Sequence, residues 1–129
     1  MKKHRSLLLI IIISLASMTG TQAGDAHKSA IKRIAKIALS TNHFPSDSDK
    51  AELKTIMNNK NINDSLRIIA HALHNIQHSV NNTDKKALNK IANDAAAQPD
   101  IRKLAKILSD FNHNLSSNVS KELENIIGA

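Results

Sequence analysis

Apolar positions along the chain recur at a fixed interval of 35 residues. Segments 31–65, 66–100 and 101–129 align in this register without gaps. Aligned positions that are aliphatic in all three copies include Ile31, Leu66 and Ile101; Ile34, Ile69 and Leu104; Ala35, Ala70 and Ala105; Ala38, Leu73 and Leu108; Leu53, Leu88 and Leu123; and Ile56, Ile91 and Ile126. Self-similarity at one period is the sequence signature of a repeat protein.

Each copy predicts two helices. Positions 31, 34, 35, 38 and 41 of the first copy step by three and four, which is the spacing of one apolar helix face. Positions 53, 56 and 57 give a shorter stripe of the same kind. We therefore predict an all-α fold of three stacked 35-residue helical hairpins, a solenoid-like array. The six expected helices cover residues 28–42, 47–59, 64–78, 82–96, 99–112 and 117–127.

Polar residues mark where these helices should begin. Ser46, Asn81 and Ser116 occupy equivalent positions, and the side-chain oxygen of each can accept a free backbone N–H at a helix N-terminus. Asn63 and Gln98 are also equivalent, and Pro99 suits a first helical position. These residues place helix starts at both joints of the repeat.

The first two dozen residues resemble a signal peptide. Lys2, Lys3 and Arg5 precede an unbroken apolar run over 7–13. Ser14, Leu15 and Ala16 extend it to about half the length that a membrane-spanning helix needs. Small residues at Thr21 and Ala23 predict cleavage after residue 23. We therefore expect a bacterial protein that is exported to the periplasm or secreted, with one mature domain over 24–129.

Composition excludes several classes of function. The chain has no cysteine, which rules out disulfides, thiolate metal sites and cysteine nucleophiles. Losing the leader removes three of 18 basic and none of 11 acidic residues, so the mature net charge is only +4. Export and the absence of Tyr and Trp argue against a nucleic-acid partner. No phosphate loop, HExxH motif or nucleophile elbow is present, so we expect no enzyme activity and no obligatory cofactor.

His43, His78 and His113 fall at the same place in each copy, and each follows a carboxamide residue. One interpretation is structural: a histidine at the end of each first helix can bond free carbonyls and interact with the helix dipole. The other is a ladder of metal ligands. Helices in contact lie about 8 to 10 Å apart, so two adjacent histidines along the stack can share an ion and three in a row should not.

The middle repeat offers a separate metal candidate. His71, His74 and His78 are spaced i, i+3 and i+7 and would lie on one face of the helix predicted over 64–78. Imidazole nitrogens suit zinc, copper or nickel. A solvated polar stripe is the alternative.

Our leading functional hypothesis is a protein-interaction module, because stacked repeats commonly bind a protein partner through an extended surface. The second is metal binding by the middle-repeat histidines. The third is weak contact with anionic membrane or envelope components through a basic first helix. The residues of that basic cluster are Lys28, Lys32, Arg33 and Lys36.

Overall fold

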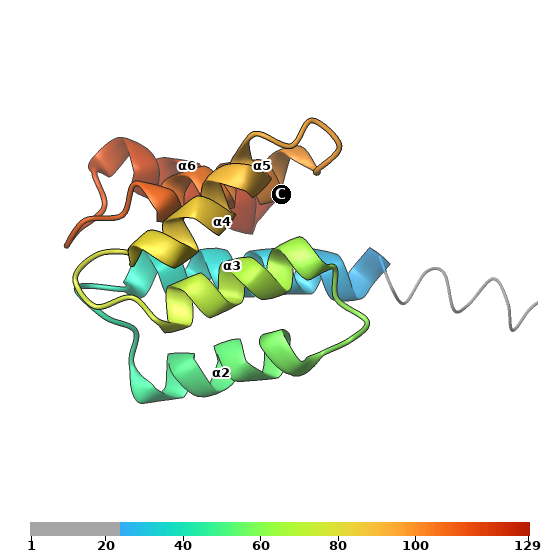
Figure 1. Cartoon of the computed structure of the whole chain (residues 1–129), viewed down its shortest axis with the longest axis horizontal. Helices are drawn as coiled ribbons and strands as arrows, with labels where there is room; N and C mark the ends of the chain where they lie inside the picture. Colours follow the sequence, from blue (N-terminus) through green and yellow to red (C-terminus); the bar gives the residue numbers. More distant parts are fainter. Residues whose placement is uncertain (1–23) are drawn as a thin grey trace, which may run out of the picture.

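The computed structural model describes residues 24–129 (Figure 1). The predicted signal peptide, residues 1–23, lies outside them. The described part is all-helical, with a first helix over 24–40 and no strand. The helices that follow are α2 (Asp47–Asn58), α3 (Asp64–His74), α4 (Asn82–Ala92), α5 (Pro99–Ser109) and α6 (Ser117–Gly128). No helix in 24–129 is both long enough and apolar enough to cross a membrane.

The aligned aliphatic positions form the core. Ile34, Ile69 and Leu104 have no exposed surface, and the same is true of Ala35, Ala70 and Ala105. The second helices contribute Leu53, Leu88 and Leu123, which are also fully buried. Burying each large aliphatic side chain contributes about 1.5 to 3 kcal/mol. The apolar stripes predicted for both helices of the repeat are confirmed.

The helix starts agree with the predicted caps. The side chains of Ser46, Asn81 and Ser116 accept the backbone N–H groups of Asp49, Asp84 and Val119. Asn63 caps α3 by accepting from Ser65, whereas Gln98 makes no side-chain cap and Pro99 opens α5. Every predicted start after the first helix is therefore correct to the residue.

Helix ends differ from the prediction. α3 ends at His74 instead of residue 78, α5 ends at Ser109 instead of 112, and α4 ends at Ala92 instead of 96. After α3 and α5 the chain still buries an apolar side chain, Ile76 or Phe111, but from a turned segment. The apolar pattern in the sequence runs past the end of each of these helices, because a loop residue can also be buried in the core.

Packing brings the loops after the first helices to one end of the molecule. Among α2 to α6 the most extensive contacts join α2 to α3 and α4 to α5, and α3 also contacts α4 and α5. In Figure 1 the loops that follow 24–40, α3 and α5 all lie at the left end. These three loops, residues 41–45, 76–80 and 111–115, are called the histidine loops below.

Candidate metal centre

Each histidine loop is anchored at both ends and exposed in the middle. Its first residue is buried: Thr41, Ile76 or Phe111. Its last residue is also turned inward, since Pro45 and Val80 are buried and Leu115 is partly buried. The three residues between these anchors, with the histidine at their centre, face solvent. Two buried or partly buried anchors four residues apart therefore fix each loop and direct its histidine outward.

The histidines adopt an unusual backbone conformation. His43, His78 and His113 have φ angles of 62°, 66° and 62°, and they are the only non-glycine residues of 24–129 with positive φ. This left-handed region costs a side-chain-bearing residue about 1 to 2 kcal/mol, whereas glycine adopts it freely. Histidine tolerates it better than most residues. A shared strained conformation at three equivalent positions shows that the three loops have the same local geometry.

The backbones of these histidines form a closed ring of hydrogen bonds. The N–H of His78 donates to the carbonyl of His43 at 2.6 Å, and the N–H of His113 donates to the carbonyl of His78 at 2.6 Å. The N–H of His43 completes the ring by donating to His113 at 3.2 Å. The first copy thus meets the third, which an open linear stack does not allow at this end.

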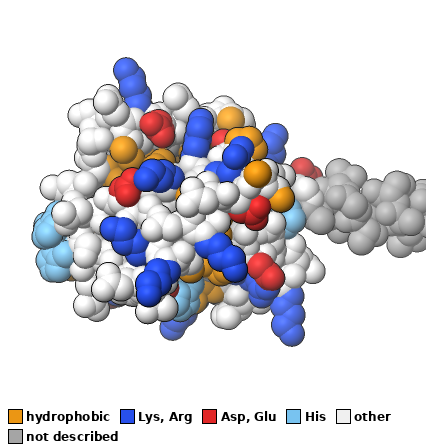
Figure 2. All heavy atoms as spheres, turned by 45° about the horizontal axis from the view of Figure 1, so that its top comes forward, with side chains coloured by type: hydrophobic (Ala, Val, Ile, Leu, Met, Phe, Trp, Pro, Cys, Tyr) orange, Lys and Arg blue, Asp and Glu red, His pale blue; other side chains and the backbone are white. Residues whose placement is uncertain are grey.

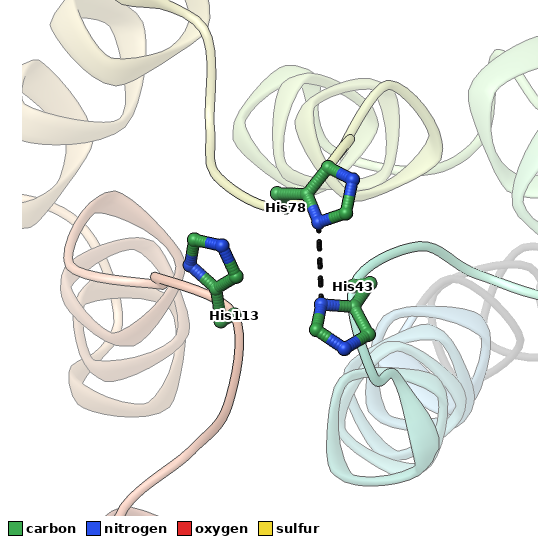
Figure 3. A group of neighbouring side chains, drawn as sticks. All are labelled: His43, His78 and His113. Carbon is green, nitrogen blue, oxygen red and sulfur yellow. Dashed lines mark hydrogen bonds between the residues drawn. The ribbon is translucent and has the colours of Figure 1, made fainter.

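The imidazole rings gather above this backbone ring (Figure 3). Their centroids are 5.0, 5.6 and 5.3 Å apart for the pairs 43–78, 43–113 and 78–113. One nitrogen from each ring can be chosen so that all three lie within 4.8 Å of one another. Within 24–129 this is the one group of three or more histidine or carboxylate side chains with metal-site spacing.

Our expectation that three histidines would not converge is wrong. It took their separation from the distance between packed helix axes. In the structure the histidines lie beyond the helices, and the spacing is set by direct backbone hydrogen bonds between loops. Sequence repetition identified the residues, but their closure into a ring depends on loop conformation, which the apolar pattern does not encode.

The side-chain contacts are compatible with metal ligation. The Nδ1 atoms of His43 and His78 are 3.2 Å apart, joined by a hydrogen bond. Two nitrogens bound to one tetrahedral zinc at 2.0–2.1 Å are about 3.3 Å apart. His113 Nδ1 lies 2.6 Å from the side-chain oxygen of Asn112, an acceptor, so Nδ1 carries the proton and Nε2 is left to ligate.

The expected helix-end role of these histidines takes a different form. The expectation was that each side chain bonds the last carbonyls of the preceding helix, whereas the imidazoles bond one another or the Asn112 side chain. The backbone N–H groups of the three histidines bond the carbonyls of other histidine loops. The backbone at these positions therefore links the three repeats to one another. This link needs the left-handed backbone and not the imidazole.

The structure does not group His71, His74 and His78 as one three-ligand site. α3 ends at His74, so His78 leaves the helix face that their spacing assumed. His71 Nδ1 instead lies 3.3 Å from a carboxylate oxygen of Asp84, and His74 Nδ1 lies 3.2 Å from the Asn75 side-chain oxygen. Metal binding by this trio stays a prediction.

Asp84 is a functional candidate that sequence reasoning missed. It is buried, its backbone N–H donates to the Asn81 side-chain oxygen, and its carboxylate accepts a hydrogen bond from the Asn81 amide at 2.6 Å. Asp84 and His71 line a shallow pocket of about 500 Å³ with Met57, Arg67 and Ile68. The equivalent pair in the first copy is Lys36 and Asp49. Among the described residues Lys36 and Asp49 form no ion pair, so the contact between His71 and Asp84 has no counterpart in the first copy.

The basic residues of the first helix are divided between two environments. Arg33 forms an ion pair with Glu52 of α2, and both side chains are partly exposed. Lys28 and Lys36 are exposed and Lys32 is half-buried. Among the described residues none of these three lysines is in an ion pair, so contact with anionic surfaces stays a prediction.

Comparisons of the chain with protein-family models, curated proteins and solved structures gave no match.

Proposed function

We propose that residues 24–129 form a small exported, non-enzymatic protein that binds one transition-metal ion through His43, His78 and His113. The observation that carries this proposal is that three equivalent imidazoles each offer a nitrogen within 4.8 Å of the other two. In this proposal the three helical hairpins close around the ion instead of forming an open solenoid. Export rests on the predicted signal peptide.

The backbone supports a role for the side chains. If the backbone ring alone mattered, glycine would form it at lower cost in strain. Histidine stands at all three positions instead, with its ring exposed and making contact mainly with the other two rings. Binding of one metal ion would account for a histidine side chain at each of the three positions.

The donor set defines the class of metal. Three imidazole nitrogens suit zinc, copper and nickel, whereas calcium and magnesium need oxygen ligands. Three histidines around one ion is also a known zinc arrangement, with a further position left for another ligand. We assign the site to this group of divalent metals.

The test is a competition titration of the mature protein with zinc and a chromophoric chelator. One zinc per chain should bind, and His78→Gly should lower the affinity at least about 10-fold, because even the loss of an outer-shell partner of a metal ligand typically costs that much. The matched control is the double variant H71A/H74A, which removes two histidines of the same repeat and should leave the affinity unchanged. Loss of affinity in that control alone would assign the metal to α3 and contradict the proposal.

A protein-interaction role is a second candidate. Phe44, beside His43, is 59% exposed, and Ile68 is 40% exposed at the rim of the pocket near His71. Aromatic side chains are enriched in protein–protein interfaces, which makes exposed Phe44 the candidate contact. Replacing Phe44 with Ser should weaken capture of a protein from the cell envelope without changing the zinc affinity, whereas undiminished capture would contradict the role of Phe44.

A further inference from the structure

We propose that the metal-loaded centre binds a small anion as an additional ligand on its outward side. This inference rests on the metal-binding function proposed above. It assigns to the protein a second ligand, of the class of azide, chloride, hydroxide or a small carboxylate, that is bound through the metal.

The geometry of the three histidines leaves a bound ion open on one side. The ring of backbone hydrogen bonds joins His43, His78 and His113 on the protein side of the imidazoles. The rings themselves face solvent, and Figure 2 shows histidine side chains gathered at the left end of the molecule. An ion held by three nitrogens is therefore closed on the inner side and open outward. Zinc and copper with three protein ligands complete their coordination with an external group.

The ligands do not neutralise the charge of a bound metal ion. The three ligands are neutral when they bind, and the group of possible ligands contains no carboxylate. Apart from the histidines, the histidine loops contain only uncharged residues over 42–45, 77–80 and 112–115. A divalent ion would keep its full charge at this site. The ion is then the largest local charge, and an anion is the ligand that this charge favours.

The polar side chains that precede the histidines are uncharged carboxamides. The side-chain oxygen of Asn112 is hydrogen-bonded to His113, so it supports a ligand instead of reaching the ion. The equivalent residues, Asn42 and Gln77, are exposed carboxamides and bring no charge. Exposed Phe44 adds apolar surface next to His43. The side chains next to the three histidines in the loops therefore supply neither a competing negative ligand nor a charge that would repel one.

The experiment loads the mature protein with one equivalent of copper(II) and titrates it with sodium azide. Azide bound to copper gives a ligand-to-metal charge-transfer absorption, which should rise and saturate at one azide per copper. The His78→Gly variant, loaded identically, serves as the control for loosely bound copper and should not give the same saturable transition.

Charge substitutions test the electrostatic argument. Gln77→Glu places a carboxylate beside His78 and should lower the azide affinity by about 5- to 10-fold, through repulsion or by occupying the open position. The matched control, Asn89→Asp, adds the same charge on an exposed position two turns into α4 and should change the azide affinity less than 2-fold, because separated surface charges are screened.

The outcomes separate the two proposals. Copper that binds at His43, His78 and His113 without an azide transition would overturn the anion inference and leave the metal-binding function standing. Failure of copper to bind would overturn the metal-binding function and the anion inference with it. An azide affinity lowered equally by Gln77→Glu and Asn89→Asp would contradict the local charge argument.

Discussion

The N–H of His78 donates to the carbonyl of His43 at 2.6 Å, although 35 residues separate them in the chain. With the equivalent bonds to and from His113, it connects three loops that share no regular secondary structure. The ring places the imidazoles together before any metal arrives. Preorganisation of this kind lowers the entropic cost of binding.

The ring predicts opposite results for two substitutions at residue 78. His78→Gly keeps the N–H and permits positive φ, so the free energy of unfolding of the metal-free protein should change by less than about 1 kcal/mol. His78→Pro removes the donor and cannot adopt positive φ, so it should cost about 3 kcal/mol or more. Urea unfolding monitored by circular dichroism measures both. Equal losses in the two variants would contradict the ring as a backbone device.

Core packing predicts a large effect at Leu73. This side chain has no exposed surface, and Leu73→Ala should destabilise the protein by about 2 to 5 kcal/mol through lost burial and a cavity. Ile68→Ala on the same helix is the control, because Ile68 is 40% exposed, and it should cost less than about 1 kcal/mol. Denaturant midpoints compare the two variants, and similar values would contradict the assigned core.

The caps of α4 and α6 predict a graded loss. Asn81 accepts the Asp84 N–H at 2.8 Å and also donates to the buried Asp84 carboxylate. Ser116 accepts the Val119 N–H at 3.4 Å. Asn81→Ala should therefore cost about 2 kcal/mol and Ser116→Ala about 0.5 kcal/mol, both measured by thermal unfolding. The reverse order would contradict the additional bond to Asp84.

Zinc should stabilise the fold because the proposed ligands come from all three repeats. At a free zinc concentration 100 times the dissociation constant, linkage predicts a gain of about 2.7 kcal/mol. For a domain of this size, that gain raises the melting temperature by about 10 °C or more. Scanning calorimetry with and without zinc measures the shift. The His78→Gly variant should lose most of it; an equal shift in that variant would place the stabilising metal elsewhere.

The sequence predicted the parts of the fold that local chemistry determines. Ser46, Asn81 and Ser116 start helices because their side chains satisfy backbone N–H groups within the same turn. Burial of Ile34, Ile69 and Leu104 was predicted because apolar residues lie three or four positions from each of them, on the same helix face. Both inferences need only neighbouring residues.

Features that depend on contacts between distant loops were not predicted. Ile76 and Phe111 extend the apolar stripe in sequence, yet they are buried from loops, and this extended the predicted helices too far. The convergence of His43, His78 and His113 follows from positive φ angles and bonds between loops. The positions of the histidines in the sequence do not predict these angles and bonds. Their recurrence at the same place in all three copies was the signal that marked the residues.

Metal binding by the three loop histidines is tested by following the imidazole nitrogen resonances of the ¹⁵N-labelled chain over 24–129 by NMR as zinc is added. Six of the seven histidines lie within 24–129, so ligands and bystanders are observed together. We expect the imidazole nitrogen resonances of His43, His78 and His113 to change together and saturate at one zinc per chain. Those of His71 and His74 should not change. Coordinated changes at His71 and His74, or no saturable change at the three loop histidines, would contradict it.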